Sequence, residues 1–319
     1  MLLLVDESQL REAVRRHGYR DLRVDRDAPA RVTLVRDDGS TTRAYLRLAR
    51  SRTRYDNERA ALDLIEQRLR PAPIPRLLLA LPDVGQGALL VDYLPGLNLA
   101  DFIPPGADTP PLPPTYRHSE PALQDGLPEA LVAAGRAVQQ MHQIEAPHFG
   151  PLAGALPNPH LHNARAYTRQ KATHMLAYAT ELGALSEAEV GRIHSWLEPR
   201  FPLIAPGERP APTHFDLHAG NLRFGVVEAG VYFQAIFDLE LARGWLAEDD
   251  LALLSWYLRG IPGGWQAFCV GYATPVDVER LALFDMIKAL TAVAHGKSDA
   301  WRDWCYRRVW QVLAGNRIE

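Results

Sequence analysis

The sequence is poor in cysteine and has no long apolar run. Only two of its 319 residues are cysteines, Cys269 and Cys305. Neither belongs to a C-x-x-C pattern, which fits a reduced cytosolic protein without a structural zinc site. No segment approaches the roughly 20 apolar residues of a membrane span, and the apolar start at residues 1–5 is too short for a signal peptide. We therefore expect a cytoplasmic protein that has no membrane partner.

Excess charge and long repeats are also missing. The formal net charge is −3, so nothing in the composition indicates a general affinity for nucleic acid. No internal repeat of solenoid length is visible. The chain is long enough to form two lobes, each with its own core. Nucleic-acid-binding proteins and repeat proteins are therefore disfavoured as classes.

The most informative stretch, residues 214–221, reads HFDLHAGN and has the pattern H-x-D-x-x-x-x-N. This is the layout of a kinase catalytic loop, and Asp238 follows it where a kinase has its metal-binding aspartate. Phosphoryl transfer needs a carboxylate that orients and deprotonates the attacking hydroxyl, and oxygen ligands that hold Mg²⁺ against the nucleotide phosphates. We predict that Asp216 is this base and that Asn221 and Asp238 are the Mg²⁺ ligands.

The segment after this loop predicts how Asp238 reaches Asn221. Residues 222–227 and 231–237 are largely apolar and β-prone, and the short link at residues 228–230 is typical of a hairpin. A hairpin returns the chain to its starting point. We therefore expect Asp238 to lie beside Asn221, where the two residues can share a metal ion.

The block at residues 214–254 resembles the aminoglycoside phosphotransferase and choline kinase family, the protein-kinase-like small-molecule kinases. That family has a loop close to H-G-D-x-H-x-x-N, a strand that ends in I-D-W-E, and a D-L-A that opens a helix. The equivalents here are HFDLHAGN, IFDLE and the DLA of residues 250–252. Phe215 stands where the family usually has a small residue, and Leu239 where it often has an aromatic one. The match is residue by residue in this block and looser elsewhere.

This resemblance implies an α+β, two-lobed protein-kinase-like fold. The N-terminal nucleotide-binding lobe, residues 1–92, is expected to be a small antiparallel β-sheet with one helix. The C-terminal catalytic and acceptor-binding lobe, residues 93–319, is expected to be larger and mainly α-helical. Sequence patterns predict a hairpin from residues 31–35 and 41–48, and helices at residues 55–69, 129–143, 166–182 and 187–197.

Two charged residues of the N-lobe match the ion pair that positions nucleotide phosphates in kinases. Glu58 lies on the apolar stripe of the helix predicted at residues 55–69, and Arg47 lies on the preceding strand, where protein kinases have lysine. The alternative is that Arg47 is one of several solvated strand arginines. With the catalytic block present, we favour a phosphate contact for Arg47. Tyr45 departs from the family, which often needs a small residue near this position to admit the adenine ring.

Other nucleotide-binding features are less regular. The resemblance makes the segment around Asp92 and Leu94 the hinge, where backbone groups would contact the purine edge; a strand leaving the sheet into a Pro-Gly turn fits equally well. The expected phosphate-covering loop, residues 25–30, contains no glycine, so its N–H groups approach phosphates less freely. The proline-rich segment at residues 103–128 either borders the acceptor site or is an insertion.

Further residues of the catalytic block receive supporting roles. We expect His214 to brace the loop by hydrogen bonds rather than to react. For His218 we favour the same supporting role over a contact with a phosphate or the acceptor. Asp250 opens a predicted helix, where it would cap the N-terminus and brace the loop. Glu240 would either assist a metal through water or pair with a basic residue such as Arg243.

We predict a phosphotransferase that moves the γ-phosphoryl group of ATP or GTP to a hydroxyl of a small molecule, with Mg²⁺ as cofactor. Its acceptor stays open between aminoglycosides, amino alcohols, sugars and similar compounds, because fold resemblance does not determine substrate. One alternative is a pseudokinase that binds a nucleotide or a partner without turnover. Another is a metal-dependent hydrolase using His214, Asp216, His218 and Asp238, because H-x-D-x-H also resembles a metal-ligand cluster.

Overall fold

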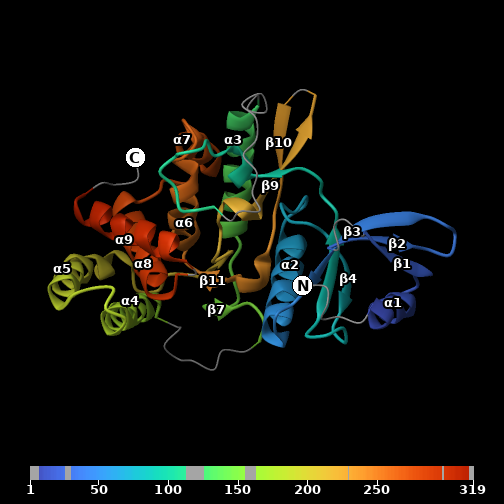
Figure 1. Cartoon of the computed structure of the whole chain (residues 1–319), viewed down its shortest axis with the longest axis horizontal. Helices are drawn as coiled ribbons and strands as arrows, with labels where there is room; N and C mark the ends of the chain where they lie inside the picture. The colour runs from blue at the N-terminus through green and yellow to red at the C-terminus, as the bar shows by residue number, and fades with distance from the viewer. Residues whose placement is uncertain are drawn as a thin grey trace.

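The computed structural model describes residues 7–25, 30–112, 126–154, 163–228, 230–296 and 298–315. It has the predicted α+β fold, with a sheet-rich N-lobe and a mainly helical C-lobe (Figure 1). The five-stranded sheet lies at one end of the molecule and helices α4, α5, α8 and α9 at the other, with α2 between them (Figure 1). The phosphate-covering loop and the proline-rich segment lie partly outside the described residues.

The N-lobe is an antiparallel sheet with strand order β1-β2-β3-β5-β4. Its elements are α1 (Glu7–Arg16), β1 (Asp21–Val24), β2 (Arg31–Val35), β3 (Thr41–Leu48), α2 (Arg52–Arg68), β4 (Leu77–Leu81) and β5 (Ala88–Asp92). The sequence predicted one helix in this lobe, which corresponds to α2. Helix α1 is added, and its buried residues Leu10, Ala13 and Val14 join the core of the sheet.

Helix α2 connects the two lobes. Ser51 caps its N-terminus by accepting the N–H of Arg54 at 3.3 Å. The buried face of α2 carries Tyr55, Asn57, Glu58, Ala61, Leu62 and Ile65. Its apolar members belong to the same core as the helices of the C-lobe. The helix is therefore packed against both lobes at once.

The C-lobe contains two small sheets, of order β10-β9-β6 and β7-β11-β8. Their strands are β6 (Leu97–Asn98), β7 (Gly150–Pro151), β8 (Ala211–Thr213), β9 (Leu222–Val227), β10 (Gly230–Ile236) and β11 (Arg243–Trp245). The α-helices are α3 (Leu127–His142), α4 (Ala164–Glu181), α5 (Glu187–Leu197), α6 (Glu248–Leu258), α7 (Gly264–Tyr272), α8 (Val278–His295) and α9 (Asp299–Leu313). Short 3₁₀ helices are η2 (Leu99–Phe102), η5 (Glu198–Leu203), η6 (Ala219–Asn221) and η7 (Leu239–Leu241).

The hairpin after the catalytic loop is present as predicted. Strands β9 and β10 pair antiparallel, with Leu222 opposite Ile236 and Val227 opposite Gly230. The N–H of Phe237 then donates to the carbonyl oxygen of Asn221 at 2.8 Å. The hairpin thus returns the chain to the end of the catalytic loop, one residue before Asp238.

Helices α3 and α7 approach each other through two glycines. A Cβ atom at Gly135 of α3 would lie 2.1 Å from the carbonyl oxygen of Phe268, and one at Gly271 of α7 would lie 1.8 Å from that of Val132. Both distances are far below van der Waals contact. The close packing therefore requires glycine at both positions.

In the described part of the chain, no helix has the length and apolar character needed to cross a membrane.

Candidate active site

The loop at residues 214–221 joins β8 to β9 and is held in place by His214. This side chain is fully buried. Its Nε2 lies 2.6 Å from the carbonyl oxygen of Phe237, and its Nδ1 accepts the N–H of Asp216 at 3.3 Å. Both ring nitrogens are engaged, so His214 braces the loop and ties it to the residue before Asp238.

Asp250, in the first turn of α6, holds the start of the same loop. Its carboxylate accepts the N–H groups of His214 at 2.6 Å and Phe215 at 2.7 Å, and lies 3.1 Å from Nε2 of His142. Burial raises the pKa of Asp250, but the hydrogen bond with His142 and the positive charge of Lys288 outweigh burial and hold this pKa below its ordinary value. Asp250 therefore braces the loop as an ionised group. The predicted capping role is wrong, because α6 begins two residues earlier, at Glu248.

Asp216 lies on the open side of the loop, with 43% of its side chain exposed. Its Oδ2 is 4.0 Å from Nε2 of His218, whose Nδ1 accepts the N–H of Gly220 at 3.0 Å. Asn221 is buried, and its Nδ2 donates to the backbone carbonyl of Asp216 at 2.9 Å. This bond orients Asn221 and leaves its amide oxygen for another partner.

Arg47 of β3 bridges two acidic residues, Glu58 of α2 and Asp238. Its Nε lies 2.8 Å from Oε1 of Glu58, and its Nη2 hydrogen-bonds the carboxylate of Asp238. Burial lowers the pKa of Arg47, but Glu58 and Asp238 more than offset this and raise it. Burial also raises the pKa of Glu58 to about 7, against the opposing charge of Arg47. The structure brings together the strand-to-helix pair of the sequence prediction and adds Asp238 to it.

Asp238 has a left-handed backbone conformation with φ of 66°. This conformation is uncommon for residues other than glycine, and such strain often occurs at functional sites. The oxygen atoms of Asp238 and Asn221 are the hard ligands that Mg²⁺ prefers. The two residues fit a Mg²⁺ site, provided that Asp238 is shared with Arg47 or released from it.

Asn57 of α2 is a site residue that sequence reasoning missed. Its Nδ2 donates to the carbonyl oxygens of Glu240 at 3.0 Å and Ala242 at 2.7 Å, and its Oδ1 accepts the N–H of Leu152 at 2.7 Å. The segment that follows Asp238 is thus fastened to α2. The one available signal was an asparagine next to Glu58 on a helix face that is otherwise apolar.

Glu240 belongs to the same connection between the lobes. Its carboxylate pairs with Arg54 of α2. The suggested pairing with a basic residue is confirmed, but the partner is not Arg243, whose guanidinium carbon lies 3.4 Å from the ring centroid of Phe215. Glu240 therefore helps to hold α2 rather than the start of β11.

Phe215 is surrounded by three cationic side chains. Besides Arg243, the Nζ atoms of Lys288 and Lys171 lie 4.5 Å and 5.1 Å from its ring centroid. Lys288 also donates to the Phe215 carbonyl at 2.8 Å and pairs with Asp249 at 2.5 Å. Phe215 has φ of 68°, which is strained for a bulky residue, and the cation–π contacts offset part of that strain.

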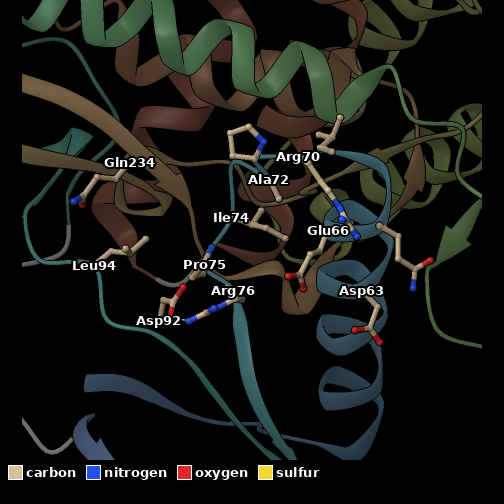
Figure 2. A pocket seen from close by; sticks show the side chains of 13 residues that line it. Asp63, Glu66, Arg70, Ala72, Ile74, Pro75, Arg76, Asp92, Leu94 and Gln234 are labelled. Atoms are coloured by element: carbon tan, nitrogen blue, oxygen red, sulfur yellow. Dashed lines mark hydrogen bonds and ion pairs between the residues drawn. The ribbon is translucent and has the colours of Figure 1, made fainter. Parts of the chain in front are cut away.

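The predicted hinge residues lie together at the end of β5. Asp92 pairs with Arg76 at 3.4 Å, and its N–H donates to the carbonyl oxygen of Arg76 at 3.0 Å. The carbonyl oxygen of Leu94 accepts from Nε of Arg223 at 3.1 Å. Figure 2 shows the side chains of Asp92 and Arg76 directed toward each other.

The cavity in Figure 2 has a volume of about 560 Å³ and lies beside this hinge. Asp92 and Leu94 line it on one side, and Asp63 and Glu66 of α2 line it on the other. Arg70 and Arg76 also line the cavity, but neither Arg47 nor any residue of the catalytic loop contributes to it. It is therefore separate from the site that Arg47 and Asp238 form.

The four residues of the metal-hydrolase alternative do not form a ligand cluster. Both ring nitrogens of His214 are engaged in the loop, and Asp238 is paired with Arg47. Among the residues that the structure describes, no group of three His, Cys, Asp or Glu side chains is placed to hold a metal ion. The geometry gives this alternative no support.

Solved structures share the fold at low sequence identity. A protein assigned as a fructosamine-3-kinase from Thermobifida fusca is 20% identical, with 89% of each chain covered and a TM-score of 0.55. The GDP complex of aminoglycoside 2'-phosphotransferase-IIIa is 11% identical, with 97% of each chain covered and a TM-score of 0.56. A macrolide 2'-phosphotransferase from Brachybacterium faecium is 17% identical, with 94% of this chain and 97% of the other covered and a TM-score of 0.53.

Sequence comparison gives the family. Among proteins with curated descriptions, none matches this chain significantly. A family model described as the phosphotransferase enzyme family matches residues 22–284. The match extends from β1 into α8 and includes every site residue predicted from the sequence. With this match and the shared protein-kinase-like fold, the chain belongs to the phosphotransferase enzyme family.

Proposed function

We propose that this protein transfers the γ-phosphoryl group of ATP or GTP to a hydroxyl group of a small molecule. In this proposal residues 1–92 bind the nucleotide, and residues 93–319 carry the catalytic loop and the acceptor site. The observation that carries the proposal is the position of Arg47, which links Glu58 of α2 to Asp238 beside the catalytic loop. A strand cation and a metal-binding carboxylate that face the same phosphates would need this arrangement.

Asp216 is the proposed base. Its exposed carboxylate would accept the proton of the acceptor hydroxyl as that oxygen attacks, which requires the two oxygens to lie roughly 3 Å apart. His214 and Asn221 hold the loop backbone on either side of it. Such bracing favours catalysis, because a positioned base loses little orientational freedom on reaction.

Asn221 and Asp238 would hold Mg²⁺, which when bound neutralises charge on the nucleotide phosphates. Arg47, oriented by Glu58, would contact the phosphates, and the hinge from Asp92 to Leu94 would border the base. Neighbours of the same fold support a nucleotide donor. One aminoglycoside phosphotransferase is known in complex with GDP and with GDP and kanamycin, and spectinomycin phosphotransferase is known in complex with AMP. Both cysteines are free, which supports the proposed cytoplasmic location.

A thermal-shift titration tests the nucleotide site. We expect ATP or GTP with Mg²⁺ to raise the melting temperature, because a ligand that binds the native state stabilises it by mass action. Asp238→Ala should lose the Mg²⁺-dependent part of this shift. The matched control is Asp83→Ala, which removes an exposed carboxylate between β4 and β5. This variant should keep the Mg²⁺-dependent shift. If neither nucleotide shifts the wild type, the proposal is wrong.

A specific observation keeps the pseudokinase as a second candidate. The ring of Tyr45 packs against Tyr93 and Phe237, with centroid separations of 5.1 Å and 6.3 Å, next to the hinge where the base would bind. Release of ADP or GDP with a panel of hydroxyl compounds separates the two candidates. We expect Asp216→Asn to lower turnover by about 100-fold or more with little change in nucleotide affinity. Nucleotide binding without product release from the wild type would favour the pseudokinase.

A further inference from the structure

Three cationic residues from separate elements meet beside the catalytic loop. Lys171 of α4, Arg243 of β11 and Lys288 of α8, here called the cationic cluster, all approach the ring of Phe215. Phe215 directly precedes Asp216, and Lys288 is hydrogen-bonded to the Phe215 carbonyl. The cluster is therefore attached to the loop that carries the proposed base.

Within the part of the chain that the structure describes, the cationic cluster has more positive than negative charge around it. Asp249 pairs with Lys288 at 2.5 Å, and its charge also acts on Lys171 and Arg243. The neighbouring carboxylate, Asp250, is engaged by the N–H groups of the catalytic loop. Among the described residues, the three cations thus face Asp249 and, through Lys288, a second carboxylate, Asp250, that is already hydrogen-bonded to the loop.

The cluster also contains a hydrogen-bond donor that has no partner among the described residues. Nε of Arg243 is buried without a hydrogen-bond partner among the described residues, although Tyr167 interacts with the same guanidinium. Burial lowers the pKa of Lys171 to about 8, and the repulsion of Lys288 and Arg243 adds to this effect while Asp249 opposes it. A partly buried cation with few partners is destabilising unless a ligand supplies charge and acceptors.

We propose that the cationic cluster binds an anionic group of the acceptor, a carboxylate or a phosphate. This inference rests on the proposed function, since the hydroxyl of the same acceptor has to reach Asp216. It assigns the acceptor to an acidic class, such as sugar acids, hydroxy acids or sugar phosphates. Cationic acceptors are disfavoured, because like charges repel at close range. Phe215 is part of the site, since its ring spaces and orients the three cations.

A titration with inorganic phosphate tests the anion site without any turnover. Nucleotide is left out and the ionic strength is held constant with chloride. We expect a saturable rise in the melting temperature of the wild type and of Lys171→Arg, which keeps the charge. In Lys171→Met the dissociation constant for phosphate should be at least tenfold weaker. Arg209→Met, which removes an arginine that is 79% exposed, controls for net charge and should behave as the wild type.

Two outcomes of this titration would overturn the proposal. One is the absence of a saturable shift in the wild type. The other is the same shift in Lys171→Met, which would place the phosphate elsewhere, for example against Arg47. Because the readout is binding alone, these outcomes do not depend on whether the protein proves to be a kinase.

A comparison of acceptors separates an acceptor group from free phosphate as the natural ligand. Turnover is measured with glucuronate, glucose and glucosamine, and with glycerate, glycerol and ethanolamine, each with Mg²⁺ and the preferred nucleotide. We expect the acid of each set to have the highest kcat/KM, and Lys171→Met to raise the KM of the acid at least tenfold more than it raises the KM of the neutral compound. A preference for the neutral or cationic compounds would reject the acidic acceptor but leave the kinase proposal intact.

Discussion

Lys171 carries a charge that folding disfavours. Its pKa is lowered by burial from an ordinary value of 10.5 to about 8. Between these two pH values the unfolded chain binds more protons than the folded one, so the free energy of unfolding rises with pH. The penalty is complete below pH 8 and absent above pH 10.5, and a shift of this size corresponds to about 3 kcal/mol.

We therefore expect Lys171→Met to be more stable than the wild type at pH 7 and to lose this advantage by pH 10.5. Urea unfolding of both proteins in phosphate-free buffer across this range measures the difference. Arg209→Met serves again as the control and should show no such pH-dependent difference. A Lys171→Met protein that is less stable at pH 7 would mean that the contact with Phe215 outweighs the cost of burial.

The roles of single residues could be predicted where residue type and spacing carry the chemistry. His214 braces the loop and Asp250 holds its N–H groups, in line with the motif. Partners that are distant in sequence could not be predicted in the same way. Glu240 binds Arg54, 186 positions away, and nothing in a local pattern distinguishes Arg54 from Arg243 as its partner.

At the scale of elements, the contact between α3 and α7 depends on Gly135 and Gly271. We expect Gly135→Ala or Gly271→Ala to lower the free energy of unfolding by about 1–3 kcal/mol or more, because the added methyl group overlaps backbone oxygen atoms. Gly191→Ala in α5, where a Cβ would meet nothing within 4 Å, should instead stabilise the protein by roughly 0.5–1 kcal/mol. Thermal unfolding of the three variants measures these changes in stability. Equal effects at Gly135 and Gly191 would show that α3 and α7 can move apart at little cost.

Elements with a strong period or a clear turn were predictable, and the hairpin of β9 and β10 is the best case. Its two apolar runs and its short link indicated both the strands and the return to Asn221. Helix α1 was missed, although Leu10, Ala13 and Val14 follow helical spacing. Its apolar face is short, and only packing on the sheet makes the helix stable.

At the scale of the whole molecule, α2 joins the lobes through polar contacts with residues 238–242, in addition to the bond from the Leu152 N–H to Asn57. Asn57 binds the backbone of residues 238–242, Arg54 binds Glu240, and Glu58 reaches Asp238 through Arg47. These contacts join residues almost two hundred positions apart. The cationic cluster likewise gathers side chains from three distant elements, so it becomes visible only in the folded chain.

If the proposed sites are occupied as described, the bridge at Arg47 would make metal binding and nucleotide binding thermodynamically dependent on each other. In the proposed site, free Mg²⁺ would have to compete with Arg47 for Asp238, whereas a nucleotide would offer Arg47 phosphate oxygens in exchange. We expect calorimetry to show that Mg²⁺ binds more tightly when a non-hydrolysable ATP or GTP analogue is present, and that the analogue gains by the same factor from Mg²⁺. Equal Mg²⁺ affinity with and without the analogue would contradict this coupling.

Arg47→Gln should act in opposite directions on the two ligands, with tighter binding of free Mg²⁺ and weaker binding of the analogue. The wild-type protein would then respond cooperatively to the metal–nucleotide complex and only weakly to either component. A single guanidinium would in this way act as a coincidence detector, so that the phosphate site assembles only when both components arrive.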